Sequence, residues 1–141
     1  MAKAFDAKLY EADNPAIHDA IAYLESIDWL AFENPDRYGI DVIAINPHGD
    51  AWHVEVEVKH NWQGYEFPYK SVHFSARKIK FAYQNSLFIM FNNDRTAALA
   101  VRGSVVAKCP KVVKKTLYTE LEEFIEVPIK KCKRIPLSRG N

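Results

Sequence analysis

The chain has 141 residues, of which 48% are hydrophobic and 13% aromatic, enough for one domain with a sizeable core. Its apolar runs are far too short to span a bilayer, and its first residues lack a signal-peptide pattern, so we expect a cytoplasmic protein without a membrane partner. Cys109 and Cys132 lie 23 positions apart without further Cys or ordered His ligands nearby, which favours reduced thiols over a zinc site.

The net charge is only +1, but its distribution along the chain is uneven. Residues 1–34 hold two lysines and seven acidic residues, a net charge of −5, whereas residues 108–141 hold nine Lys or Arg and four Glu, a net charge of +5. A basic C-terminal third can face the phosphates of a nucleic acid. A solvated lysine face explains the same composition, and charge alone does not decide between the two.

The first predicted element is an amphipathic helix over residues 14–26. Asn14 is a favourable N-cap and Pro15 fits the first helical turn. Apolar residues then recur at helical spacing to Ser26. A short strand over residues 29–33 and a turn-rich connection follow.

Two strands joined by a turn come next, over residues 39–45 and 52–59. The turn between them is rich in Asn, Pro, Gly and Asp, as turns require. The second strand alternates strictly, with Trp52 and three valines on one face. The other face carries polar side chains, namely His53, Glu55, Glu57 and Lys59.

The rest of the chain predicts an aromatic loop over residues 60–69, a helix over 76–84 and two further strands over 86–91 and 96–101. The run 86–91 is continuously apolar, which is typical of a strand buried on both sides. A late edge strand is expected over 124–129, where a proline is tolerated.

This order of elements predicts an α/β fold, with helices on either side of a central mixed sheet. We expect a single domain over residues 1–141, with a core over about residues 14–101 and a basic C-terminal extension over about 103–141.

Acidic side chains meet on one face of the predicted hairpin. If Ile45 pairs with Ala51, Asp41 lies opposite Glu55 and diagonal to Glu57; a small shift of register places Asp41 opposite Glu57. In either case two or three carboxylates converge, which is costly unless a cation lies there. Mg²⁺ prefers oxygen ligands and usually takes one or two carboxylates together with water and phosphate.

Lys59 points to the same face, two residues beyond Glu57. An ammonium beside a metal-bound carboxylate can orient or deprotonate an attacking water and stabilise developing charge, while the metal lowers the pKa of that water. The hairpin can therefore supply the groups for phosphodiester hydrolysis. An ordinary solvent-facing strand of alternating charge is the alternative.

Residues 38–44, Tyr-Gly-Ile-Asp-Val-Ile-Ala, and residues 56–59, Val-Glu-Val-Lys, resemble the motifs of the PD-(D/E)xK nuclease superfamily, most of all the archaeal-type Holliday junction resolvases. The likeness covers roughly residues 14–101. It implies a restriction-endonuclease-like α/β/α sandwich with a central mixed sheet, cleavage of DNA that depends on Mg²⁺, for which Mn²⁺ can substitute, and a homodimer.

By position, the resemblance implies that Asp41 and Glu57 are metal ligands and that Lys59 is the catalytic lysine. It also implies the backbone carbonyl of Val58 as a further metal ligand.

The chain departs from the family pattern in three places. Ile40 precedes Asp41 where the family has Pro. The acid that these resolvases often carry early in the first helix has two candidates, Glu11 and Asp19, and neither matches cleanly. Glu55 is an additional acid, either a second-metal ligand or a surface charge.

Six further residues are candidates for contact with DNA. Three basic residues of the predicted helix over 76–84 can anchor phosphates, or else form a solvated face. Two residues directly after Lys59 can stack on a base or contact the DNA backbone, although a core position is the alternative for Trp62. The six candidates are Tyr38, His60, Trp62, Arg77, Lys78 and Lys80.

The sequence therefore favours a Mg²⁺-dependent DNA endonuclease, selective for branched DNA if the resemblance extends to the substrate. Two alternatives remain open. One is a non-catalytic nucleic-acid-binding or assembly protein on the same fold. The other is a nuclease that acts on ordinary duplex, single strands or RNA.

Overall fold

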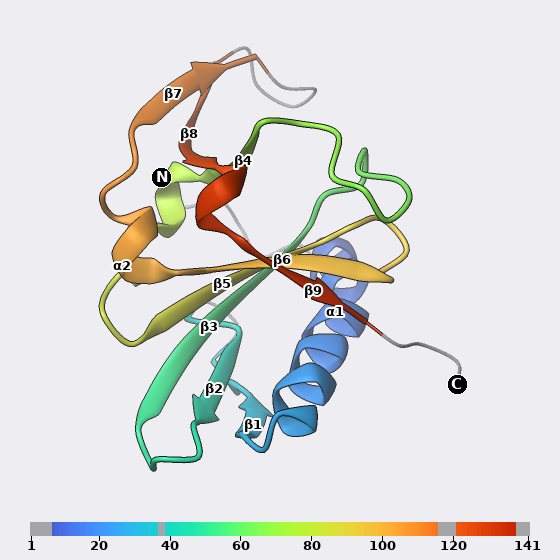
Figure 1. Ribbon diagram of the computed structural model, residues 1–141, viewed down its shortest axis with the longest axis vertical. Coiled ribbons are helices and arrows are strands. Elements are labelled where there is room, and N and C mark those ends of the chain that lie inside the picture. The colour runs from blue at the N-terminus through green and yellow to red at the C-terminus, as the bar shows by residue number, and fades with distance from the viewer. Residues whose placement is uncertain (1–6, 37–38, 116–120, 138–141) are drawn as a thin grey trace.

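The computed structural model of the protein describes residues 7–36, 39–115 and 121–137 (Figure 1). A six-stranded sheet crosses the molecule in the order β1-β2-β3-β5-β6-β9. β3 and β5 are parallel, whereas the other neighbouring strands are antiparallel, so the predicted mixed sheet of an α/β fold is confirmed. The strands are β1 (Leu30–Glu33), β2 (Val42–Ile45), β3 (Ala51–Val58), β5 (Ser86–Phe91), β6 (Ala97–Arg102) and β9 (Lys133–Pro136).

Helix α1 (Ala7–Ser26) covers one face of this sheet (Figure 1). It begins seven residues before the predicted start and contains Pro15 in its interior. A proline there removes one backbone hydrogen bond and crowds the preceding turn, so the sequence pattern favoured a start at this residue, whereas the helix continues on both sides of it. Its small and aliphatic side chains pack on alternating valines and alanines of β2 and β3. The buried residues at this contact are Ala16, Ile17, Ala20, Leu24, Val42, Ala44, Val54 and Val56.

A three-stranded sheet, which we call the small sheet, covers the other face. Its strands, in the order β4-β8-β7, are β4 (Ser71–Ser75), β8 (Glu122–Pro128) and β7 (Lys111–Lys114). Three short helical turns accompany it: η1 (Ala76–Phe81), α2 (Gly103–Val106) and η2 (Ile129–Lys131). The core on this side is built mainly from strand side chains, among them Val72, Phe74, Ile125 and Val127.

The helix predicted over residues 76–84 is instead the 3₁₀ turn η1, and Ala76 is its buried residue. A turn that buries so little apolar surface lacks the packing that stabilises a longer helix. The second outer layer is therefore mostly sheet, whereas a helical layer was predicted.

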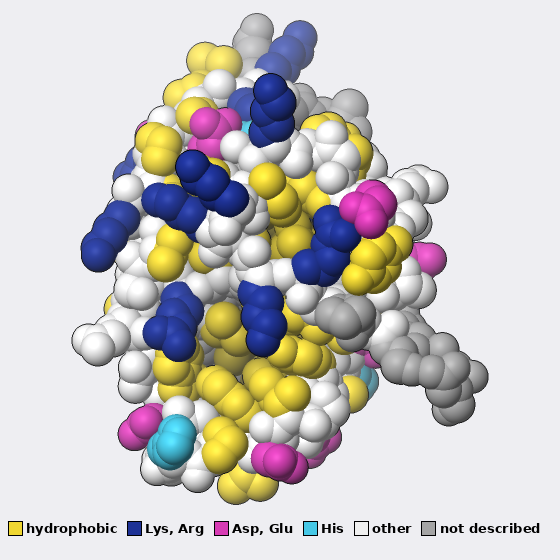
Figure 2. Space-filling view, in the orientation of Figure 1, with side chains coloured by type: hydrophobic (Ala, Val, Ile, Leu, Met, Phe, Trp, Pro, Cys, Tyr) yellow, Lys and Arg dark blue, Asp and Glu magenta, His cyan; other side chains and the backbone are white. Residues whose placement is uncertain are grey.

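The C-terminal third contributes to both sheets. β9 pairs with β6 at the edge of the main sheet, and β8 lies between β4 and β7 rather than at the edge predicted for residues 124–129. Figure 2 shows Lys and Arg side chains gathered around an apolar hollow on the face where β6, β9 and η2 lie. The exposed basic residues of those elements are Arg102, Lys130, Lys131 and Lys133.

The register of the β2–β3 hairpin is the first of the two predicted. Ile45 pairs with Ala51, and Val42, the first residue of β2, pairs with Val54. Asp41 therefore comes one step beyond the paired residues, level with Glu55. Among the described residues, none of the helices has the length and hydropathy of a membrane span.

Candidate active site

Asp41 is fastened to β3 by two hydrogen bonds that run in opposite directions. Its backbone N–H donates to Oε2 of Glu55 (3.1 Å), and its own Oδ2 accepts the backbone N–H of Val56 (2.8 Å). Asn34, the residue after β1, also binds residues 40–41. Its side-chain amide donates to the carbonyl of Ile40 (2.9 Å) and its backbone N–H to the carbonyl of Asp41 (3.0 Å). The Asp41 carboxylate is thus fixed where the strand pairing ends.

Lys78 extends from η1 to the acidic face of β3. Its ammonium lies 3.3 Å from Oε1 of Glu55 and 3.8 Å from Oε1 of Glu57. Glu55 is only 4% exposed, so it is not the surface charge that was one of its two predicted roles. The Lys78 side chain is 17% exposed and directed at carboxylates, which does not support the phosphate contact predicted for it.

The charges at this site change the proton affinity of each group. Burial raises the pKa of Glu55 to about 7, with Asp41 adding to the rise and Lys78 opposing it. Burial also raises the pKa of Asp41, against the lowering effects of Lys78 and the Val56 hydrogen bond. Burial alone would lower the pKa of Lys78, but Glu57, Glu55 and Asp41 together raise it above its ordinary value. Three carboxyl groups therefore share the Lys78 ammonium, and two of them, Asp41 and Glu55, bind protons more tightly than an exposed carboxylate does.

Lys59 continues β3 beyond its last residue, with its backbone N–H donating to the carbonyl of Phe91 (2.8 Å). Its ammonium lies 5.3 Å from the ring centroid of Tyr69. Burial and Lys114 lower the pKa of Lys59, whereas Glu57 raises it. The ammonium consequently lies within the electrostatic influence of both Glu57 and Lys114.

The donor chemistry of this site fits Mg²⁺ in one respect. Across residues 7–36, 39–115 and 121–137, no group of three or more His, Cys, Asp or Glu side chains is placed to hold a metal ion. Asp41 and Glu57 nevertheless supply hard carboxylate oxygens, and Mg²⁺ commonly takes only one or two of these and completes its shell with water and phosphate. Glu55 is less suited to bind a metal, because its Oε2 already accepts the backbone N–H of Asp41 and its Oε1 is paired with the ammonium of Lys78.

Asp19, one of the two helical acids predicted as further ligands, is not brought to this site. Asp19 accepts a hydrogen bond from Nε of Arg95 (2.8 Å), on the face of the sheet that α1 covers. Glu11 belongs to α1, and its side chain lies outside the described part of the structure.

The candidates for DNA contact differ in exposure. Trp62 is 0% exposed and its indole N–H donates to the carbonyl of Glu66 (3.1 Å), so it has the core role, and no face of its ring is open to a base. His60 is exposed and its Nδ1 lies 3.2 Å from Oδ1 of Asn93.

Three further candidates for DNA contact remain, two of them on η1. Arg77 and Lys80 are exposed on η1, the turn that also carries Lys78. Tyr38 lies outside the described residues.

One acid near the site was not found from the sequence. Glu33 pairs with Val42 across the β1–β2 ladder and adds to the raised pKa of Asp41. The signal that could have identified it is the position of β1 beside β2, because antiparallel pairing of neighbouring strands brings the last residue of β1 level with the start of β2.

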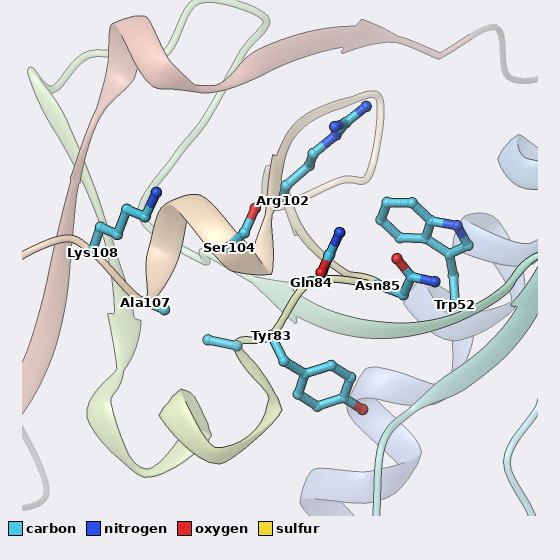
Figure 3. Close-up of a pocket in the computed structure, with 9 residues that line it drawn as sticks. Trp52, Tyr83, Gln84, Asn85, Arg102, Ser104, Ala107 and Lys108 are labelled. Carbon is cyan, nitrogen blue, oxygen red and sulfur yellow. The ribbon is translucent and has the colours of Figure 1, made fainter.

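A separate pocket of about 480 Å³ opens at the far end of β3 from Lys59 (Figure 3). The guanidinium of Arg102 lies 5.9 Å from the ring centroid of Trp52 there. None of the residues that line this pocket is among the site residues predicted from the sequence. They are Trp52, Ala82, Tyr83, Gln84, Asn85, Arg102, Ser104, Ala107 and Lys108.

No protein-family model matches the chain, and no curated protein matches it in sequence. In structure, the chain is similar to Hjc of Archaeoglobus fulgidus, a Holliday junction resolvase from an archaeal hyperthermophile, with a TM-score of 0.50 and 12% sequence identity. The match covers 82% of each chain. At this identity it shows the fold alone, and it confirms the resolvase-like α/β fold that the two strand motifs predicted.

Proposed function

We propose that this protein is a Mg²⁺-dependent nuclease that hydrolyses phosphodiester bonds of branched DNA at a site formed by Asp41, Glu57 and Lys59. The observation that carries the proposal is the convergence of Glu55 and Glu57 on the Lys78 ammonium near the end of β3, with a second lysine, Lys59, two residues beyond Glu57. The fold similarity to a Holliday junction resolvase supports the choice of DNA.

Each residue has a separate role in this proposal. When bound, Mg²⁺ would lower the pKa of its water and neutralise charge on the phosphate. Asp41 and Glu57, with the Val58 carbonyl, present oxygens to the metal, and Mn²⁺ is expected to substitute. The hydrogen bond from the Val56 N–H keeps the Asp41 carboxylate in one orientation, so that little ordering is required at reaction.

The two lysines of the site act differently. Lys59, half-buried beside Glu57, orients the attacking water and stabilises the charge that develops on the phosphate. Lys78 reduces the repulsion between Glu55 and Glu57 and so permits the carboxylates to remain close together.

Cleavage of end-labelled DNA tests the proposal. We expect the wild-type protein to cut a four-way junction in Mg²⁺ and not in EDTA, and to cut duplex, single strands and RNA more slowly. Asp41→Asn, Glu57→Gln and Lys59→Met should each reduce the rate at least about a hundredfold. The matched control is Asp50→Asn, at the exposed turn of the same hairpin. Wild-type rates in Asp41→Asn or Lys59→Met would overturn the proposal.

A non-catalytic nucleic-acid-binding protein is the second candidate function. It is favoured by the position of Lys78, which already neutralises two carboxylates without a metal. Such a protein would bind DNA equally well in EDTA and would leave every substrate of the cleavage assay intact.

We also propose that the protein acts as a homodimer, as expected from the resemblance. Edge strand β1 exposes two large apolar side chains, Leu30 at 66% and Phe32 at 49%, a surface that a second copy would cover. Sedimentation equilibrium should return twice the monomer mass, and Leu30→Lys should reduce it to the monomer value. A monomeric wild-type protein would contradict this part of the proposal.

A further inference from the structure

A cleft of about 310 Å³ lies between the end of β3 and the small sheet. Lys59 lines it from β3, Lys70 and His73 from the segment of β4, and Lys114 and Glu126 from β7 and β8. Lys59 is also a residue of the proposed active site, so the cleft adjoins that site. The small sheet therefore adds a second group of polar side chains beside the carboxylates.

His73 connects two of these side chains. Its Nε2 lies 3.0 Å from Oε2 of Glu126, and its Nδ1 lies 3.4 Å from the ammonium of Lys114. An ammonium can only donate, so Nδ1 must accept and the ring proton must lie on Nε2, where it donates to Glu126. The histidine thereby acts as a rigid bridge that holds the Lys114 ammonium toward the cleft.

The bridge is built by the register of the sheet. His73 and Glu126 are direct partners in the β4–β8 ladder, and the ring of Phe124 packs edge-on against His73 with centroids 6.2 Å apart. The His73 side chain is only 15% exposed. The ladder and the ring packing both fix His73, which therefore offers the Lys114 ammonium an acceptor of defined position.

Cations outnumber anions in this cleft. Three lysines and one glutamate line it, and the glutamate is already engaged by His73. Lys59, Lys70 and Lys114 line the same cleft, so their ammonium groups share one small space. Like charges brought together in this way attract an anion, and phosphate oxygens are suited to several lysine donors at once.

We propose that this cleft binds a phosphate of the nucleic-acid backbone beside the one that is cleaved, with Lys59, Lys70 and Lys114 as its ligands. Glu126 and His73 are positioning residues for Lys114. The identification of the anion as a backbone phosphate rests on the proposed function, whereas the anion site itself rests on the geometry of the cleft. The substrate strand then runs from the C-terminal end of β3 over the small sheet.

Binding of DNA without cleavage tests this inference. Fluorescence anisotropy of a labelled four-way junction in EDTA should show Lys114→Ala several-fold weaker than the wild type. The slope of log Kd against log salt concentration should decrease by about one, as expected for one lost phosphate contact. Lys114→Arg, which keeps the charge, should bind almost as the wild type does.

Lys111→Ala is the matched control. Lys111 is also an exposed lysine of β7, three residues before Lys114, and strand alternation places the two side chains on opposite faces. We expect its affinity and salt slope to equal those of the wild type. Equal affinity and slope in Lys114→Ala and Lys111→Ala would overturn the inference.

A double-mutant cycle tests the positioning role of His73. His73→Ala should weaken binding in the wild-type background and have little further effect in the Lys114→Ala background, because it acts through Lys114. Additive losses would overturn this role. Far-ultraviolet circular dichroism of each variant checks that the small sheet remains folded.

Two comparisons separate this inference from the proposed function. Weaker binding in Lys114→Ala, together with wild-type cleavage in Asp41→Asn, would retain the cleft and overturn the nuclease site. Loss of cleavage in Asp41→Asn, together with unchanged binding in Lys114→Ala, would retain the nuclease site and overturn the phosphate cleft. Calorimetric titration with inorganic phosphate is the third arm: tight binding of free phosphate without any effect of Lys114→Ala on DNA would assign the cleft to the free anion and overturn the inference.

Discussion

The ammonium of Lys78 lies 3.3 Å from Oε1 of Glu55, a carboxylate that is only 4% exposed. This contact joins the η1 turn to the central sheet, because Lys78 also reaches Glu57 on the same strand. The outer layer and the proposed active site are therefore coupled: the group that fastens η1 to β3 is also the counter-ion of the site. Stability and metal binding should then respond to the same substitutions.

Substitution of Lys78 by methionine tests this coupling. Removing one partner of a largely buried ion pair leaves charged carboxylates without their counter-ion, and we expect Lys78→Met to reduce the free energy of unfolding by about 3 kcal/mol. Urea denaturation followed by tryptophan fluorescence measures it. Lys80→Met, an exposed lysine of the same turn, is the control and should change it by less than about 0.5 kcal/mol. A Lys78→Met protein as stable as this control would show that the pair contributes nothing.

The raised pKa of Glu55 predicts how stability depends on pH in the presence of a chelator. The ordinary glutamate pKa of 4.5 applies to the unfolded chain, whereas the folded protein holds the proton of Glu55 up to about 7. The folded state binds more protons between these values, so the contribution is fully present below 4.5 and is lost as the pH rises through about 7.

Glu55→Gln removes this titration, and its comparison with the wild type isolates the effect. We expect the free energy of unfolding of the wild type to fall relative to that of Glu55→Gln as the pH rises from about 4.5 to about 7 in EDTA. Chemical denaturation at several pH values measures the difference. A constant difference over this window would mean that Glu55 ionises normally in the folded protein.

The parts of the site that could be predicted from sequence lie close together along the chain. The turn between Ile45 and Ala51 limited the pairing to two registers, and the first of them, which the structure has, places Asp41 level with Glu55. Lys78 and Glu33 reach the site through tertiary packing, which no local pattern encodes. A basic residue on a short turn has the same local pattern whether it faces solvent or a buried carboxylate.

The dependence on tertiary packing also explains why parts of the fold differ from the prediction. The C-terminal third is basic and weakly periodic, so only one of its strands, over residues 124–129, was predicted. Long-range pairing nevertheless places Ile135 opposite Ala98 in the main sheet. In the loop after Lys59, composition could not decide whether Trp62 was open to a base or buried. Both outcomes depend on which distant surface the segment packs against.

The buried position of Trp62 predicts a large loss of stability on truncation. Its ring packs edge-on against Phe67 with centroids 5.1 Å apart, and its N–H is satisfied by a backbone carbonyl. Trp62→Ala should therefore lower the free energy of unfolding by about 3 to 5 kcal/mol. Tyr65→Ala, in the same loop but 46% exposed, is the control and should have a much smaller effect on thermal unfolding. Equal melting temperatures for the two variants would contradict the core assignment.

Binding of Mg²⁺ should stabilise the folded protein even without DNA. The carboxylates of Asp41 and Glu57 exceed the charge that Lys78 neutralises, so a divalent cation relieves repulsion that the folded state otherwise carries. At ten times its dissociation constant, a ligand specific for the folded state contributes about 1.4 kcal/mol. We expect a corresponding rise in the melting temperature of the wild type at constant ionic strength.

The same titration on variants identifies the residues responsible. Asp41→Asn retains an oxygen that can accept the Val56 N–H and removes one negative charge, so this variant should fold well and yet show little rise with Mg²⁺. Glu57→Gln should behave alike, whereas Asp50→Asn, at the exposed turn of the hairpin, should respond as the wild type does. An equal rise in all four proteins would place the cation elsewhere, and no rise in the wild type would contradict the prediction that the free protein binds the metal. Since differential scanning fluorimetry detects the cation without any cleavage, this measurement separates a metal site that lacks activity from a site that binds no metal.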